Sequence, residues 1–273
     1  MNVLELNHLD LPVWLPPLLV GTVGLVVGSF LNVVIHRLPV GESVATPASR
    51  CPICLHRVRI IDNIPVVSWL LLRGRCRDCG GPISPRYPIV EVLNLAAYLL
   101  AFNEFGLTAF LPVSLVLCSA LIVLAFIDAE HMILPNRITY PLFVLFVLYR
   151  IIDSLFVTNS LAPAINGSVG ALIGGGLLFL LGAVWKILRG IDAMGFGDVK
   201  MMAVVGMLLG WQLALLSIFI GALLGSTIGL VFAIRKGIDL QTPIPFGVFL
   251  AAGSFVSLLF GTDIIDWYLR LFI

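Results

Sequence analysis

The sequence predicts an all-α polytopic membrane protein with about eight transmembrane helices and a small soluble domain between the first two. Of the 273 residues, 60% are hydrophobic and only 11% are charged, and the apolar residues gather in long runs. A soluble domain of this length would carry far more charge on its surface. The first ten residues lack the basic start of a cleavable signal peptide, so we expect the N-terminus to be retained.

The apolar runs define the expected spans, since a helix needs about 20 apolar residues to cross a bilayer. The candidate spans are residues 13–36, 88–104, 107–127, 138–157, 166–188, 197–210, 212–234 and 244–262. The sixth and seventh come from one apolar stretch, 199–234, which as a single helix would be about 54 Å long. The hydrocarbon core is only about 30 Å thick. We therefore expect a break near Gly210 and Trp211, where the aromatic side chain suits an interface.

The basic residues indicate the orientation of these spans. If residues 37–87 face the cytoplasm, all of the 16 Lys and Arg residues except Arg150 and Arg270 lie on the cytoplasmic side. This is a strong positive-inside bias. It predicts that both termini lie outside and that Asp128 and Asp198 lie on the same cytoplasmic face.

We expect three parts along the chain. Residues 1–36 form an N-terminal segment and the first transmembrane helix, residues 37–87 form the soluble domain, and residues 88–273 form the transmembrane core. The soluble segment is polar and rich in Pro and Gly. Small residues inside apolar helices favour close helix packing in lipid. We expect that role for Gly170, Gly174, Gly175, Gly176, Gly221 and Gly225.

Four of the five cysteines form two CxxC pairs in the soluble segment, Cys51-Pro-Ile-Cys54 and Cys76-Arg-Asp-Cys79. Two such pairs supply the four thiolates of a tetrahedral zinc site. Disulfides and a redox CxxC are the alternatives, but disulfides are rare in the cytoplasm. The sequence therefore predicts a small cytoplasmic zinc-binding domain. Its zinc is structural, because four sulfur ligands leave no open coordination position.

Two aspartates border long apolar runs and are the best candidates for chemistry. Asp128 follows the run that ends in Phe-Ile, and Asp198 stands in Gly195-Phe-Gly-Asp-Val-Lys200. An acidic side chain so close to the membrane interior is costly unless it is paired, hydrated or used. Two carboxylates in one low-dielectric site share a proton. One can then act as general base on a water while the other acts as general acid.

A purely structural role for each aspartate is the alternative. Asp198 would cap a helix that begins at Val199, with Lys200 screening its charge, and Asp128 would pair with Arg137. Gly195 and Gly197, on either side of Phe196, would allow close approach of another chain.

The motifs taken together resemble those of the bacterial type IV prepilin peptidases, over nearly the whole chain. They are Gly28-Ser-Phe-Leu-Asn-Val-Val-Ile-His-Arg-Leu-Pro39, the double CxxC box, Asn63-Ile-Pro-Val-Val-Ser-Trp69, Gly74-Arg-Cys-Arg-Asp-Cys-Gly80, Ile83-Ser-Pro-Arg-Tyr-Pro-Ile-Val-Glu91, Asp128 with Leu134-Pro135, Gly195-Phe-Gly-Asp-Val-Lys200 and Pro245-Phe-Gly247. Two positions depart from the common pattern, because Asn136 stands where many members have Asp and Asp192 where Glu is common.

The resemblance implies an aspartic endopeptidase of the bacterial inner membrane that cuts basic leaders from prepilins and pseudopilins, typically after a glycine. Asp128 and Asp198 occupy the family's catalytic positions, and Gly195, Gly197 and Lys200 belong to the supporting motif. Members with the cysteine domain usually also methylate the new N-terminal residue with S-adenosylmethionine. We expect prepilins and the lipid bilayer as partners, and no nucleic acid.

Three other functions are alternatives. A peptidase without methylation shares every motif of the core. A transporter with the aspartates as a cation relay would need acids on both halves of the membrane. An assembly factor would keep its function without either aspartate.

Glu91, Glu130 and Asp192 are candidates for attracting a basic leader, and an interfacial ion pair is the equal alternative for each.

Overall fold

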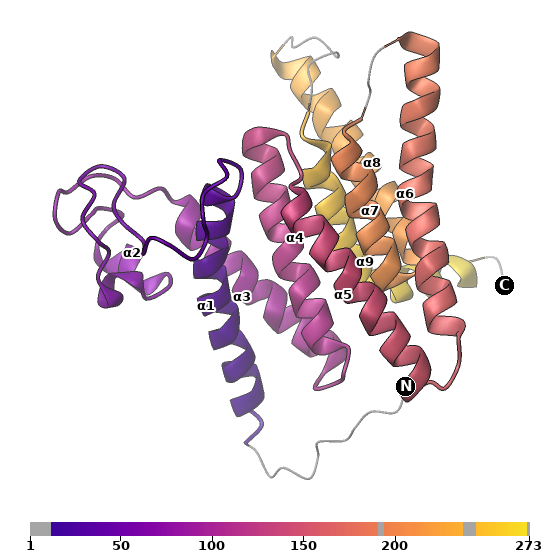
Figure 1. Cartoon of the computed structure of the whole chain (residues 1–273), viewed down its shortest axis with the longest axis horizontal. Helices are drawn as coiled ribbons and strands as arrows, with labels where there is room; N and C mark the ends of the chain where they lie inside the picture. The colour runs from indigo at the N-terminus through magenta and orange to yellow at the C-terminus, as the bar shows by residue number, and fades with distance from the viewer. Residues whose placement is uncertain (1–11, 191–193, 237–243, 272–273) are drawn as a thin grey trace. The chain divides into compact units, whose positions relative to one another are not determined.

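The structure is a computed structural model of the whole chain, and it describes residues 12–190, 194–236 and 244–271. Within these ranges the protein is almost entirely helical (Figure 1), with two isolated β-bridges and no strand. The chain divides into two compact units, one ending at Val123 and the other beginning at Leu124. The boundary falls within a helix, so we call them the N-terminal and C-terminal units and describe each separately.

Eight long helices occupy the positions of the eight expected spans. They are α1 (Leu15–Arg37), α3 (Arg86–Phe105), α4 (Leu111–His131), α5 (Asn136–Ile152), α6 (Ala162–Arg189), α7 (Phe196–Leu209), α8 (Trp211–Lys236) and α9 (Phe246–Arg270). Shorter elements are η2 (Ile60–Asn63), α2 (Val67–Leu71) and the π-helical turn η3 (Asp153–Val157). The expected break is confirmed, because Gly210 has φ +86° between α7 and α8.

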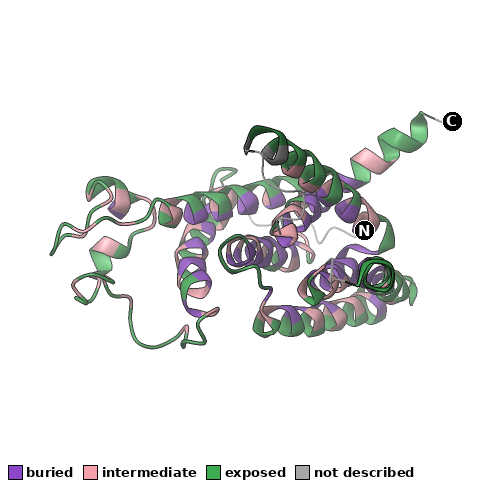
Figure 2. Ribbon diagram, turned by 90° about the horizontal axis from the view of Figure 1, so that it is seen from above, coloured by how far each residue is buried: buried purple, intermediate pink, exposed green. Residues whose placement is uncertain are grey.

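Seven helical segments in the described part of the chain are long and apolar enough to cross a membrane. The protein is therefore a multi-pass membrane protein. Of the eight long helices, α7 is the one that is too short to cross a membrane. Its 14 residues reach only about 21 Å at 1.5 Å per residue. Figure 2 shows buried residues where helices face one another and exposed residues on outer faces. Large apolar side chains such as Leu172 and Ile187 on α6 are 74% and 82% exposed, as lipid-facing positions require.

In the N-terminal unit, α1 and α3 pack through glycines and a buried asparagine. A β-carbon at Gly28 would lie 2.8 Å from the Cα of Glu91, so the backbones approach closely there. Asn94 is fully buried and its Nδ2 donates to the carbonyl of Gly24 at 2.7 Å. Its Oδ1 accepts from Ser119 on α4 at 3.0 Å. Buried hydrogen bonds of this kind hold helices together where no water can compete.

In the C-terminal unit, glycines let α6 pack on α7 and α8 pack on α9. A β-carbon at Gly174 would lie 2.6 Å from the carbonyl oxygen of Met202, and one at Gly221 would lie 3.0 Å from that of Phe249. These close approaches confirm the packing role expected from the sequence. Gly176 is the exception, because nothing lies within 4 Å of its β-carbon position. The expectation of close packing was wrong for that residue, which faces open space on α6.

The C-terminal end of α7 is closed by an arginine from α5. The guanidinium of Arg150 donates to the carbonyl oxygens of Met207 and Leu208, which are among the last residues of α7. It also lies 3.7 Å from the Asp153 carboxylate. The last carbonyls of a helix have no partner within the helix, so a cation here satisfies acceptors and offsets the helix dipole. This structural role explains why Arg150 is one of the two basic residues that fall outside the expected cytoplasmic set.

Candidate active site and metal centre

Asp128 lies in the last turn of α4 and is only 5% exposed. The backbone N–H groups of Gly247 and Val248, in the first turn of α9, face its carboxylate. Such N-terminal amides have no partner within their own helix and suit an anionic group. The Asp128 Oδ2 atom, however, is buried without a hydrogen-bond partner in the described part of the chain. The site thus holds an acceptor that a water or a substrate group could satisfy.

Asp198 is the third residue of α7 and is 7% exposed. The residue before the helix is Gly195, and its backbone N–H faces the Asp198 carboxylate. A side chain at the third helical position that reaches back in this way is a capping interaction. The expectation of a helix beginning at Val199 was therefore wrong in position, since α7 begins at Phe196 and includes Asp198. Capping accounts for the backbone contact and leaves the burial of the acid unexplained.

The two carboxylates meet at Gly247. A β-carbon at Gly247 would lie 2.8 Å from Asp128 Oδ2 and 3.3 Å from Asp198 Oδ1. Both acids therefore approach the same point beside the first turn of α9, although 70 positions separate them in the numbering. The glycine leaves the space between them free of any side chain. In the sequence, Pro245-Phe-Gly247 has no role beyond the resemblance. The only feature that could have indicated a functional residue there is a glycine close to the start of the last expected span.

The two glycines beside Asp198 have different surroundings. A β-carbon at Gly197 would lie 2.8 Å from the Cβ of Leu134, so Leu134 packs directly on the first turn of α7. At Gly195 the nearest atom to a β-carbon would be Asp198 Oδ2, at an ordinary 3.6 Å. Gly197 is therefore required for close packing, whereas Gly195 is not. The close approach expected at the motif comes from this chain's own Leu134.

Lys200 points away from the aspartates. Its Nζ donates to Asn136 Oδ1 at the start of α5, and it lies 5.6 Å and 5.3 Å from the ring centroids of Tyr140 and Phe196. It is therefore not the direct partner of Asp198. Among the described residues there is also no ion pair between Asp128 and Arg137, so the pairing alternative for Asp128 was wrong.

The other acids considered as leader contacts have varied surroundings. Glu91 is buried, and its Oε2 accepts from the backbone N–H of Val66 at 2.7 Å, which makes it a structural residue of the N-terminal unit. Glu130 is exposed. Asp192 lies outside the described residues.

The four cysteines of the soluble segment come together. The Sγ atoms of Cys51, Cys54, Cys76 and Cys79 all lie within 4.8 Å of one another, and none forms a disulfide. Tetrahedral coordination with Zn–S bonds of about 2.3 Å places sulfurs about 3.8 Å apart, and Cys51 and Cys79 are 3.9 Å apart. The cluster could therefore hold a metal ion. Cys118 is fully buried in α4, away from these positions.

The two cysteine pairs have the same backbone geometry. In each pair the first cysteine accepts from the residue four positions later, Leu55 and Gly80, both of which have positive φ. Backbone hydrogen bonds from Cys54 and Ile53 lower the pKa of the Cys51 thiol to about 7. Metal ions bind thiolates, so this turn favours the ionised form at Cys51, whereas desolvation and the neighbouring thiols raise the pKa of Cys54.

Comparison with known proteins extends these observations. The family model of the bacterial peptidase A24 N-terminal domain matches residues 22–105, and that of the type IV leader peptidase family matches residues 115–230. A protein of Aeromonas hydrophila is 37% identical over 99% of both chains. A protein of Dichelobacter nodosus is 37% identical over 90% of this chain and 92% of its own, and one of Pseudomonas aeruginosa is 34% identical over 90% and 91%. All three are named prepilin leader peptidase/N-methyltransferase.

The chain belongs to the type IV leader peptidase family. In this family member both aspartates fall within the peptidase match, and all four clustered cysteines fall within the N-terminal match. Gly247, where the two carboxylates meet, lies beyond either match. No solved structure matches the chain.

Proposed function

We propose that this leader peptidase cleaves the basic leader of type IV prepilins and pseudopilins with Asp128 and Asp198, and then methylates the new N-terminal residue. One observation carries the peptidase assignment: two buried carboxylates approach one point at Gly247 in a chain whose relatives are named for leader cleavage. Neither a nucleophilic Ser nor a Cys is needed for such a reaction.

The proposed chemistry uses one ionised and one protonated carboxyl. Like charges this close disfavour ionising both groups, so the pair shares a proton. The ionised carboxylate takes a proton from a water, and the water oxygen attacks the scissile carbonyl carbon. The protonated carboxyl gives its proton to the carbonyl oxygen. Collapse of the tetrahedral intermediate breaks the C–N bond, and the amine of the mature protein leaves with a proton.

The supporting residues of the motif have roles that follow from their contacts. Gly197 allows Leu134 to pack on α7, and Lys200 joins α7 to α5 through Asn136. Both contacts connect the segment after Asp128 with the helix that carries Asp198. We assign them to positioning of the pair, and Gly195 to the start of α7.

The location of the reaction is proposed from charge. The positive-inside bias supports a cytoplasmic location for the soluble segment and both aspartates, at the bacterial inner membrane. The scissile bond of a prepilin would lie there, at the end of its apolar stem. A carboxylate pair at this boundary has access to water, and Glu130 remains a candidate contact for a basic leader.

The second half of the function belongs to the N-terminal unit. We assign Zn²⁺ to Cys51, Cys54, Cys76 and Cys79 as a structural ion, because four thiolates close the coordination sphere. S-adenosylmethionine supplies the methyl group as an electrophile bound to sulfur. The neutral amine of the cleaved protein would attack the methyl carbon; the bond from that carbon to sulfur would break, S-adenosylhomocysteine would leave, and the methylated amine would lose a proton to water.

Incubation of the purified protein with a prepilin and methyl-labelled S-adenosylmethionine tests both halves together. We expect a shortened product that carries label on its N-terminal residue. Cleavage without label would show that the protein is a peptidase without methyltransferase activity. Neither cleavage nor label, in protein that retains its metal, would favour a transporter or an assembly factor instead.

A further inference from the structure

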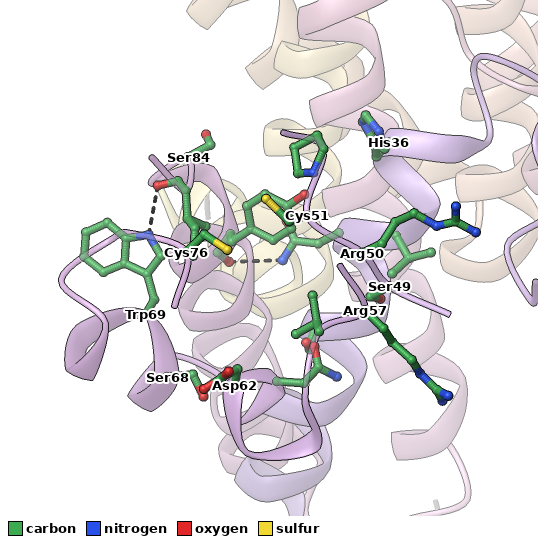
Figure 3. A pocket seen from close by; sticks show the side chains of 18 of the residues that line it. His36, Ser49, Arg50, Cys51, Arg57, Asp62, Ser68, Trp69, Cys76 and Ser84 are labelled. Carbon is green, nitrogen blue, oxygen red and sulfur yellow. Dashed lines mark hydrogen bonds between the residues drawn. The ribbon is translucent and has the colours of Figure 1, made fainter. Parts of the chain in front are cut away.

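A cavity of about 850 Å³ lies within the N-terminal unit, and neither Asp128 nor Asp198 belongs to its lining. Its walls come from the C-terminal half of α1, the soluble segment and the first turns of α3 (Figure 3). Small-molecule sites have volumes of roughly 300–1,000 Å³. Leader cleavage as proposed above makes no use of this space.

Several charged side chains in the wall already have partners. Arg77 donates to Asp62 at 2.6 Å and 3.0 Å, and this guanidinium holds the pKa of the Asp62 carboxyl below its usual range. Arg59 pairs with Asp78 at 2.9 Å. These pairs fix the shape of the segment and are not available to a ligand.

Two arginines in the same wall do remain available. Arg50 and Arg57 face each other across a β-bridge, and neither side chain forms a hydrogen bond or ion pair within the described part of the chain. Figure 3 shows both extending from one side of the cavity, with Trp69 on the other. Their guanidinium ends point away from each other, so each can donate separately to a carboxylate or another planar anion.

A buried acceptor in the wall also lacks a partner. Asn32 on α1 is 1% exposed, and its Nδ2 donates to the carbonyls of Gly28 and Tyr87. Its Oδ1 is buried without any hydrogen bond to the residues that the structure describes. An unsatisfied buried acceptor is costly and rare in native structures. A ligand N–H or O–H would satisfy it once the side chains that cover this oxygen move aside.

We propose that this cavity binds the S-adenosylmethionine used for N-methylation, an inference that rests on the proposed function. The ligand carries a carboxylate for Arg50 and Arg57, and amino and hydroxyl donors for Asn32 Oδ1. Trp69 and Tyr87 supply aromatic rings in the wall, and Glu42 supplies an acid for the positive charges of the ligand. The cavity thus presents both signs of charge together with aromatic surface.

The metal centre borders the same cavity. Cys51 and Cys76, one from each cysteine pair, belong to its lining. The β-bridge that holds Arg50 and Arg57 together directly flanks the first pair. Loss of the metal would therefore disturb the wall that carries these arginines, and donor binding should be lost with it.

Equilibrium dialysis of labelled S-adenosylmethionine against the purified full-length protein tests the site without any turnover. We expect Asn32→Leu and Arg57→Gln each to weaken binding about tenfold, the effect of losing one buried or charge-assisted hydrogen bond. Arg75→Gln is the matched control, because Arg75 is an exposed arginine of the same segment outside the cavity lining. Leader cleavage and metal content should stay unchanged in all three variants.

The outcomes separate this site from the proposed function. If the wild type binds the donor and both variants bind it equally well, the cavity is not the donor site. If the wild type cleaves prepilin but neither binds the donor nor transfers label, methylation itself fails, and this inference fails with it. Arg57 is exposed, so Arg57→Gln remains informative even if Asn32→Leu loses metal and fold.

Discussion

Gly247 is the residue on which the geometry of the site depends. Its missing side chain leaves room for the carboxylates of Asp128 and Asp198, and its backbone N–H faces Asp128. In the proposed mechanism, the attacking water would occupy that room. Gly247 thus contributes to the site in two ways: it has no side chain to fill the space between the carboxylates, and its backbone N–H faces one of them.

Gly247→Ala should therefore abolish leader cleavage while the protein remains folded. The new methyl group would lie 2.8 Å from Asp128 Oδ2 and 3.0 Å from its Cγ, so the carboxyl must move. A displacement of about 1 Å at a reacting group can cost about 100-fold in rate. The rate of prepilin cleavage measures the effect, with Gly176→Ala as control because its β-carbon meets nothing within 4 Å.

The two glycines of the motif should differ in their tolerance of alanine. Gly197→Ala forces a methyl group to 2.8 Å from Leu134 Cβ, and overpacking of this kind costs about 1–3 kcal/mol. It should lower both the cleavage rate and the melting temperature in detergent. Gly195→Ala meets only an ordinary contact and should keep most of the activity. Equal sensitivity of the two positions would contradict the packing role of Gly197.

At the scale of elements, α7 is held at both ends. Its first turn packs on Leu134 and is joined to α5 by Lys200 and Asn136, and its last carbonyls bind Arg150. A helix of 14 residues that cannot span the bilayer alone depends on such neighbours. The placement of Asp198 follows from these contacts.

Arg150→Met should destabilise the C-terminal unit by about 1–3 kcal/mol, because the Met207 and Leu208 carbonyls lose their donor in an apolar setting. The midpoint of thermal unfolding in detergent measures this, with the exposed Arg270→Met as the matched control. Similar stability of the two variants would show that the guanidinium is not needed there.

At the scale of the whole molecule, the candidate peptidase residues and the cysteine cluster belong to different compact units. Asp128, Asp198 and Gly247 all follow Leu124, and the four cysteines all precede Val123. The two activities should therefore differ in their dependence on metal.

Removal of the metal by a chelator should abolish methyl transfer and donor binding, and should leave leader cleavage largely intact. Folding of a metal-dependent segment is lost with its ion. Lowering the pH should also release the metal, because protonation of thiolates competes with metal binding, but acid protonates the carboxylate pair as well, so only the chelator separates the two activities. Metal content, label transfer and cleavage are measured on the same samples, and parallel loss of cleavage would contradict this separation.

Much of this architecture could be predicted from the sequence. Apolar runs gave the helices, the length limit of a span gave the break at Gly210, and CxxC spacing gave the cysteine cluster. Local patterns could not show that Gly247 meets both aspartates, because that contact depends on how α9 packs. For the same reason the partners of Lys200 and Glu91 differed from those expected, and Gly176 faced outward.

Substitution of each aspartate by asparagine tests the central claim most directly. Asparagine keeps the size of the side chain and removes its acid–base chemistry. Cleavage of a prepilin by purified Asp128→Asn and Asp198→Asn should fall by at least about 10²–10⁴-fold, while metal content and S-adenosylmethionine binding match the wild type. Near-normal cleavage by either variant would remove that aspartate from the mechanism and return it to a capping or packing role.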